Sequence, residues 1–175
     1  IVLAGGLGKT GRRIHDRLRA RSVEAVGVSR STLPAFDWRD RATWPAALSG
    51  ATAAYVTHQP GLADPGAADD IAVFATIAAE MGVEHVVLLS IHGGRSALRA
   101  EERLRRAPLD HTILRASWFA ENFAEGALRD GGQQRVQACK VVVRRRVRDA
   151  RHLGHIAQRD AGGAMFGQQR VGRHQ

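Results

Sequence analysis

The chain has 175 residues, which is long enough for one domain with a substantial core. Its single cysteine, Cys139, excludes an intramolecular disulfide and a multi-cysteine metal site, and we expect no metal site of another kind. The sequence shows no signal peptide and no membrane span. Because the first residue is not Met, we expect an N-terminus trimmed by a few residues, and we expect a reducing, cytoplasmic location.

The formal net charge of +9 is distributed unevenly along the chain. Residues 1–125 carry 15 Lys and Arg against 14 Asp and Glu, whereas residues 126–175 carry 11 against 3. A basic excess usually indicates a nucleic-acid partner. Since the excess lies almost entirely in residues 126–175, the sequence predicts no nucleic-acid contact outside that tail, and it does not indicate an oligomeric state.

The apolar opening of the chain ends at a glycine cluster, and a helix-like segment follows at residues 12–21. The glycines fit two dinucleotide registers, Gly5-x-x-Gly8-x-x-Gly11 and Gly6-x-Gly8-x-x-Gly11. A strand, a glycine turn and a helix together form the phosphate cradle of dinucleotide-binding folds. In that cradle, backbone N–H groups at the helix N-terminus face the pyrophosphate.

A second phosphate motif overlaps the same residues. The string Gly8-Lys9-Thr10 resembles the end of a P-loop, the cradle of nucleoside triphosphates. That motif also needs a glycine five positions before Gly8, where this chain has Leu3. We therefore do not expect a nucleoside-triphosphate site.

Strand-like and helix-like patterns alternate through the first two thirds of the chain. The expected strands are residues 1–4, 23–28, 35–38, 53–57, 83–90 and 111–115, and the expected helices are residues 12–21, 40–48, 67–81 and 96–106. This alternation predicts an α/β fold with a doubly wound parallel sheet, a Rossmann domain over residues 1–125 with strand order 3-2-1-4-5-6. The apolar run at residues 86–89 predicts a central strand covered on both faces.

The loops that follow these strands lie at the carboxyl edge of the expected sheet, where such folds bind their ligands. The loops expected to converge on one crevice are residues 5–11, 29–30, 57–59 and 90–94. An NAD-selective site usually has an acidic residue at the end of the second strand, but here that place reads Ser29-Arg30-Ser31. A guanidinium at this place favours a 2′-phosphate, and Arg12 offers a second positive charge. We therefore expect NADP(H) rather than NAD(H).

Five stretches of this sequence together resemble the NmrA-like family of atypical short-chain dehydrogenases. They are residues 2–12 (VLAGGLGKTGR), 28–31 (VSRS), 36–38 (FDW), 86–90 (VVLLS) and 109–123 (LDHTILRASWFAENF). The resemblance covers about residues 1–125 and implies an NADP-binding Rossmann domain. It also implies that residues 36–38 lie near the adenine, that residues 57–59 border the cofactor, and that residues 117–119 lie near the nicotinamide.

The motifs and the resemblance together define the residues expected to contact the cofactor. They are Gly5, Gly6, Leu7, Gly8, Lys9, Thr10, Gly11, Arg12, Arg30, Asp37, Trp38, Thr57, His58, Gln59 and Ser90.

The catalytic residues are less well defined than the cofactor residues. Ordinary short-chain dehydrogenases use a Tyr-x-x-x-Lys pair, which this chain lacks, since its only tyrosine is Tyr55 within an expected strand. Ser90 and His92 are the candidate catalytic residues, although such residues often have only structural roles.

Two functions stay open: a reductase that uses NAD(P)H to reduce a quinone or a similar small acceptor, and a non-catalytic NADP(H) redox sensor. Glu101 and Glu102 are expected to form solvated ion pairs with neighbouring arginines.

The family resemblance fades in residues 126–175, which are rich in Arg, Gln and Gly. This truncated or irregular part has two interpretations. One is a disordered basic tail that binds polyanions through phosphate contacts. The other, which the abrupt change in composition favours, is the product of a frameshift that replaced the substrate-covering lobe of the family.

Overall fold

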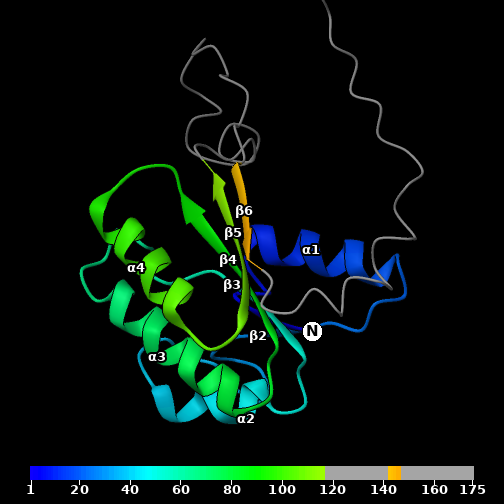
Figure 1. Ribbon diagram of the computed structural model, residues 1–175. Coiled ribbons are helices and arrows are strands. Elements are labelled where there is room, and N and C mark those ends of the chain that lie inside the picture. The colour runs from blue at the N-terminus through cyan, green and yellow to red at the C-terminus, as the bar shows by residue number, and fades with distance from the viewer. Residues whose placement is uncertain (117–141, 147–175) are drawn as a thin grey trace, which may run out of the picture.

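The computed structural model describes residues 1–116 and 142–146 (Figure 1). Its strands are β1 (Val2–Ala4), β2 (Val26–Val28), β3 (Ala53–Val56), β4 (His85–Ile91), β5 (Asp110–Ala116) and β6 (Val142–Arg146). Its helices are α1 (Lys9–Arg19), the short 3-10 helix η1 (Arg41–Thr43), α2 (Trp44–Leu48), α3 (Ala67–Glu80) and α4 (Arg95–Arg106). Residues 117–119 and the basic tail, apart from β6, lie outside these ranges.

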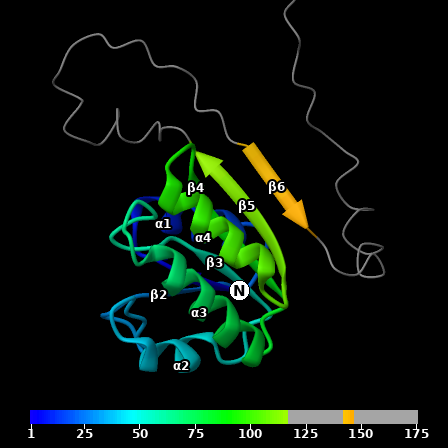
Figure 2. The ribbon, with the colours of Figure 1, turned by 60° about the vertical axis from the view of Figure 1, so that its left-hand side comes forward.

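The strands form one sheet in the order β2-β1-β3-β4-β5-β6. The first five of these are parallel to one another, and β6 pairs antiparallel with β5. Helices α2, α3 and α4 lie on one face of the sheet and α1 lies on the other, as both views show (Figures 1 and 2). The predicted α/β fold with a doubly wound parallel sheet is therefore confirmed.

One expected strand is absent from the sheet. Residues 35–38 lie beyond the end of β2, and Phe36 makes a single backbone hydrogen bond toward β2, to the carbonyl of Ser29. The chain then reverses at once, because the Asp40 N–H donates to the Asp37 carbonyl. The order of the remaining parallel strands agrees with the predicted 3-2-1-4-5-6, without the outermost member.

The main core lies between the sheet and α2–α4, where apolar side chains from all three helices meet the strands. Its largest fully buried members include Trp44, Phe74, Leu88 and Leu104. The expectation that β4 is covered on both faces is only partly right. Its side chains alternate between buried residues on the α3–α4 side and half-buried residues on the other side, where α1 is the only helix that the structure describes.

Candidate functional site

The turn between β1 and α1 has the geometry of a phosphate cradle. Gly5 has a φ of +92°, a left-handed conformation that favours glycine, and it starts the turn. Gly11 lies against the turn itself, since a Cβ at Gly11 would come within 2.5 Å of the Cα of Gly6. Any larger residue at position 11 would push the helix away from the turn. The glycine pattern therefore reflects backbone contacts in addition to chain reversal.

Helix α1 begins directly after this turn. Its N-cap, Gly8, provides no side-chain hydrogen bond, and the first turn of the helix contains no acidic residue. The first N–H groups of a helix have no intrahelical partner and lie at the positive end of the helix dipole. An anion placed at this turn can accept hydrogen bonds from them.

A cleft of about 290 Å³ opens beside the turn at the carboxyl edge of the sheet. We call it the edge cleft. It is lined by Gly5, Leu7, Gly8, Val28, Ser29, Arg30, Phe36, Asp37, Trp38, Arg39, Gln59 and Pro60. Four segments that are distant in sequence therefore meet here, as the strand order requires.

The edge cleft collects part of the set of residues expected to contact a cofactor. Those that line it are Gly5, Leu7, Gly8, Arg30, Asp37, Trp38 and Gln59. The others do not line it: Gly6, Lys9, Thr10, Gly11 and Arg12 lie in the turn or in α1, Thr57 and His58 follow β3, and Ser90 lies in β4 and bonds to Glu101. Arg39 lines the cleft although the sequence did not single it out, and its position two residues after Asp37 was the available clue.

Aromatic side chains form the wall of the edge cleft on the side of the core. The Trp38 ring lies 5.1 Å from Phe36, 5.4 Å from Trp44 and 5.6 Å from Phe74, measured between ring centroids. The Trp38 indole N–H also donates to the Thr57 carbonyl over 3.1 Å. These contacts fix the segment around residues 36–38 against the sheet, so that this wall is rigid.

His58 is buried behind the cleft and joins the loop after β3 to α3. Its Nδ1 lies 3.1 Å from the Gly61 carbonyl and its Nε2 lies 3.1 Å from Asp70 Oδ2. Asp70 also accepts a hydrogen bond from Arg41 over 2.8 Å. Burial opposes ionisation of Asp70, but the hydrogen bonds from Arg41 and His58 outweigh it and hold the pKa of that carboxyl below its ordinary value. This arrangement gives His58 a role in holding the loop.

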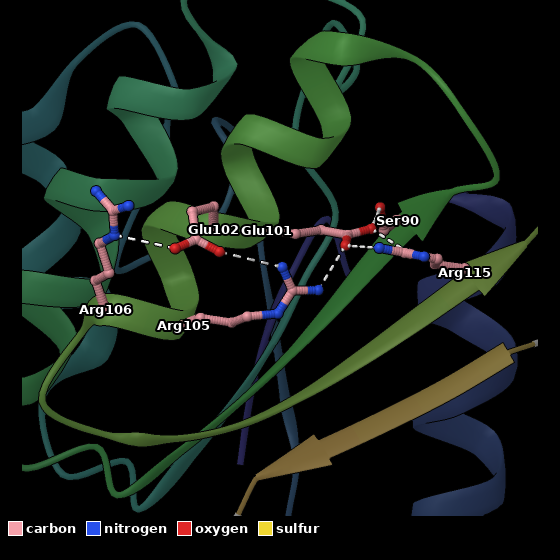
Figure 3. A network of polar contacts seen from close by, with 6 residues as sticks. All are labelled: Ser90, Glu101, Glu102, Arg105, Arg106 and Arg115. Carbon is pink, nitrogen blue, oxygen red and sulfur yellow. Dashed lines mark hydrogen bonds and ion pairs between the residues drawn. The ribbon is translucent and has the colours of Figure 1, made fainter.

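A buried polar network lies at the ends of β4 and β5 (Figure 3). We call Ser90, Glu101, Arg105 and Arg115 the Glu101 network. The Ser90 hydroxyl donates to Glu101 Oε1 over 2.7 Å, Arg115 donates to both oxygens of Glu101, and Arg105 donates to Oε2 over 2.9 Å. Figure 3 shows Glu101 extending from α4 toward both strands.

The prediction that Glu101 forms a solvated ion pair is therefore wrong, and the same prediction for Glu102 is confirmed. Glu102 is half-exposed and pairs with Arg105 and Arg106 on the helix surface, whereas the Glu101 side chain is 0% exposed. Burial opposes ionisation of Glu101, but hydrogen bonds from Arg115 and Ser90 hold the pKa of its carboxyl below its ordinary value. Glu101 is thus a buried carboxylate neutralised by two guanidinium groups.

The candidate proton donors have different surroundings. His92 follows β4, is exposed, and is tied by its backbone N–H to the carbonyl of Ala116 over 2.9 Å. The hydroxyl of Ser90 is already committed to Glu101. The Tyr55 hydroxyl is buried in β3 and has no hydrogen-bond partner among the residues that the structure describes, and burial raises the pKa of this phenol far above its ordinary value. Tyr55 is therefore a poor proton donor.

The helices that the structure describes are too short or too polar to cross a membrane. In the same part of the chain, no group of three or more His, Cys, Asp or Glu side chains is placed to hold a metal ion.

Comparisons with known proteins agree with this architecture, although no protein-family model matches the sequence. The chain is 33% identical over 143 residues to agroclavine dehydrogenase of Claviceps fusiformis, an alignment that covers 71% of the chain and 48% of that protein. The fold is similar to that of Citrobacter sp. triphenylmethane reductase complexed with NADP(H), with a TM-score of 0.64 at 16% identity, over 73% of this chain and 53% of the reductase.

A further similar structure is that of the NADPH-dependent quinone oxidoreductase of Escherichia coli complexed with NADPH. Its TM-score is 0.60 at 18% identity, over 70% of this chain and 50% of that one. The chain spans about half the length of the curated relatives it matches.

The strand order, the glycine turn and the similarity to these solved structures together show a Rossmann-like α/β fold. The sequence similarity to agroclavine dehydrogenase extends over most of this fold, and the sequence has no Tyr-x-x-x-Lys pair.

Proposed function

We propose that the chain binds NADP(H) in the edge cleft and forms the cofactor-binding part of an NmrA-like reductase that acts on a quinone or a similar small acceptor. The observation that carries this proposal is that Arg30, in the loop after β2, lines the cleft. No carboxylate occurs in residues 29–36, where an NAD-selective site would have one. A guanidinium attracts a 2′-phosphate that a carboxylate would repel.

The turn before α1 suits the diphosphate of such a cofactor. The approach of Gly11 to Gly6 leaves no Cβ between the turn and the helix, and the helix start has no side chain that competes for its N–H groups. Lys9 and Arg12 belong to the first turns of the same helix and add positive charge. Neutralisation of a diphosphate at this place needs no further residue.

The loop that presents Arg30 is held by its own hydroxyl groups. The Ser29 N–H donates to Thr32 Oγ1 over 2.9 Å, and the Thr32 hydroxyl lies 2.9 Å from the Ser29 carbonyl. The Ser31 N–H donates to Ser29 Oγ over 3.2 Å. The backbone at Arg30 is thus fixed, so that only side-chain freedom is lost when a phosphate binds.

The chemistry of the proposed reaction belongs mainly to the cofactor. A bound nicotinamide supplies a hydride, and the protein supplies binding, orientation and exclusion of water. A quinone accepts a hydride without a strong acid nearby, which suits a site whose Ser90 and Tyr55 hydroxyls are buried. The names of the similar proteins, a dehydrogenase, a dye reductase and a quinone oxidoreductase, support a reductase in general.

We also propose a cytoplasmic location, which suits a single cysteine.

Titration of NADPH fluorescence tests the proposed cofactor. We expect Arg30→Ala to weaken NADPH binding by about 10- to 100-fold, the range for a hydrogen-bonded charged group, and to change NADH binding by less than about twofold. Arg99→Ala is the matched control, since Arg99 is an exposed arginine on α4 outside the edge cleft. Equal NADPH affinities for the wild type and Arg30→Ala would remove the basis for the proposed 2′-phosphate contact.

The alternative is a non-catalytic NADP(H) sensor of the same fold. The observation in its favour is that Ser90, one of the candidate proton donors, has its hydroxyl bonded to Glu101 and lies fully buried. A stopped-flow assay of NADPH oxidation by simple quinones separates the two functions. Turnover supports the reductase, whereas tight NADPH binding without turnover supports the sensor.

A further inference from the structure

Arg39 enters the edge cleft from a different loop than Arg30. It follows Trp38, whereas Arg30 lies in the loop after β2, and both residues line the same cleft. Neither guanidinium makes a hydrogen bond or an ion pair with any residue in the ranges that the structure describes. Arg41, two residues further on, instead binds Asp70 over 2.8 Å and lies 5.9 Å from the centre of the Trp44 ring. The fold thus neutralises Arg41 but leaves Arg39 available at the cleft.

The backbone at Arg39 is fixed by short-range contacts. The Arg39 N–H donates to Asp37 Oδ1 over 3.0 Å, and the Asp40 N–H donates to the Asp37 carbonyl over 3.1 Å. The same carbonyl accepts the indole N–H of Trp44 over 2.6 Å. These contacts hold the turn, and the long stem of Arg39 lets its guanidinium reach toward a ligand without any change of the turn.

The charges that line the edge cleft are two guanidinium groups and one carboxylate. The carboxylate is that of Asp37, and one of its oxygens already accepts the Arg39 N–H. The net charge of these three groups is positive, which favours an anionic ligand group such as a phosphate monoester. The ribose 2′-hydroxyl of NAD(H) is neutral, so binding it would not require a second guanidinium group.

We propose that Arg39 is a second residue that selects the phosphorylated cofactor, by binding the 2′-phosphate together with Arg30. This inference rests on the proposed function, because it requires NADP(H) in the edge cleft. Two arginines from separate loops then hold the phosphate from two directions, and each guanidinium can donate two parallel N–H bonds. Arg39 acts on affinity and cofactor choice and takes no part in hydride transfer.

Calorimetric titration with NADPH and NADH tests the inference in the full chain. We expect Arg39→Ala to weaken NADPH binding by about tenfold or more, with NADH changed by less than about twofold. Arg39→Lys keeps the charge but loses the planar fork, so we expect it to lose less affinity than Arg39→Ala. Arg99→Ala removes one exposed positive charge elsewhere and serves as the control for net charge. Near-UV circular dichroism of each variant shows whether the fold is kept.

The possible results separate this inference from the proposed function. If the wild type does not prefer NADPH, both the cofactor choice and the inference are wrong. If Arg30→Ala loses NADPH affinity while Arg39→Ala does not, the proposed function stands and the inference is overturned. If Arg39→Ala weakens NADPH and NADH equally, Arg39 contacts a part common to both cofactors, such as the adenine, which also overturns the inference. Titration with 2′-AMP and 5′-AMP then locates the phosphate that Arg39 binds.

Discussion

The edge cleft and the Glu101 network both place arginines at the carboxyl edge of one sheet, and they use them in opposite ways. Arg30 and Arg39 line the cleft without a partner in the part of the chain that the structure describes. Arg105 and Arg115 are instead bound to one buried carboxylate, that of Glu101. The difference is the presence of a buried acid, which turns an arginine from a group available to a ligand into a structural group.

The two regions also differ in how their polar groups are satisfied. In the part of the chain that the structure describes, the side formed after β1, β2 and β3 presents a helix start without a side-chain cap together with Arg30 and Arg39, which suits a phosphate-rich ligand. The side at the ends of β4 and β5 has its polar groups satisfied internally, and Ser90 belongs to that internal set. We therefore expect changes in the cleft to alter binding and changes in the Glu101 network to alter stability.

The largest effect is expected from Glu101→Ala. This change leaves Arg115, whose side chain is only 15% exposed, without its partner and removes the acceptor of Ser90. Loss of one member of a buried ion pair costs about 3–5 kcal/mol of unfolding free energy. Urea denaturation followed by circular dichroism measures the loss.

Glu102→Ala provides the matched control for that experiment. Glu102 lies next to Glu101 on α4, but its side chain is 47% exposed and its ion pairs lie on the surface. Such pairs contribute about 0–1 kcal/mol. Equal losses for the two variants would contradict the structural role assigned to the Glu101 network.

A smaller effect is expected in the pH dependence of stability. The pKa of Glu101 is lowered in the folded state, so that its contribution is present above the unfolded value of about 4.3 and declines as the pH falls through the folded pKa. We expect the difference in unfolding free energy between the wild type and Glu101→Gln to be constant from pH 7 to pH 5 and to shrink below pH 4. Denaturation at several pH values checks this expectation. A difference that does not change down to pH 2 would show that ionisation of Glu101 does not contribute.

The sequence predicted those features that depend on local pattern. The glycine turn, Arg30 and the parallel strand order follow from spacing along the chain, and the structure bears out the fold. The role of Glu101 was missed because its partner Arg115 is 14 residues away on another element, while Arg105 at the next helical turn suggests a surface pair. The strand at residues 35–38 was expected because aromatic residues favour strands. Those rings pack instead against Trp44 and Phe74, and no local pattern shows this.

The candidate site was likewise predicted in part. Of the four loops expected to converge, those at residues 5–11, 29–30 and 57–59 contribute to the edge cleft, since the carboxyl ends of parallel strands meet at one edge, whereas the loop at residues 90–94 contributes no lining residue. Arg39 was missed because Asp37, Asp40 and Arg41 all lie within two positions of it, in a segment that looks like a solvated turn. Only the fold shows that Arg41 pairs with Asp70 and that Arg39 does not.

The smallest effect is expected from Ser90→Ala. The hydroxyl donates to Glu101, but Arg115 still binds the same oxygen, so we expect a loss of about 0.5–1.5 kcal/mol in unfolding free energy. If the chain reduces quinones, the rate should stay within about twofold of the wild type, because a hydroxyl held by Glu101 does not reach the acceptor. Parallel measurements of NADPH oxidation and of urea denaturation check both parts. A rate that falls more than tenfold with stability kept would make Ser90 a catalytic residue.

The central claim is that the edge cleft binds the cofactor, with the diphosphate at the start of α1 and the 2′-phosphate between Arg30 and Arg39. A crystal structure of the full chain with NADP⁺ tests this most directly. The account predicts diphosphate oxygens within hydrogen-bond distance of the first N–H groups of α1 and both guanidinium groups on the 2′-phosphate. NADP⁺ bound at any other place, with the glycine turn free of phosphate, would contradict it.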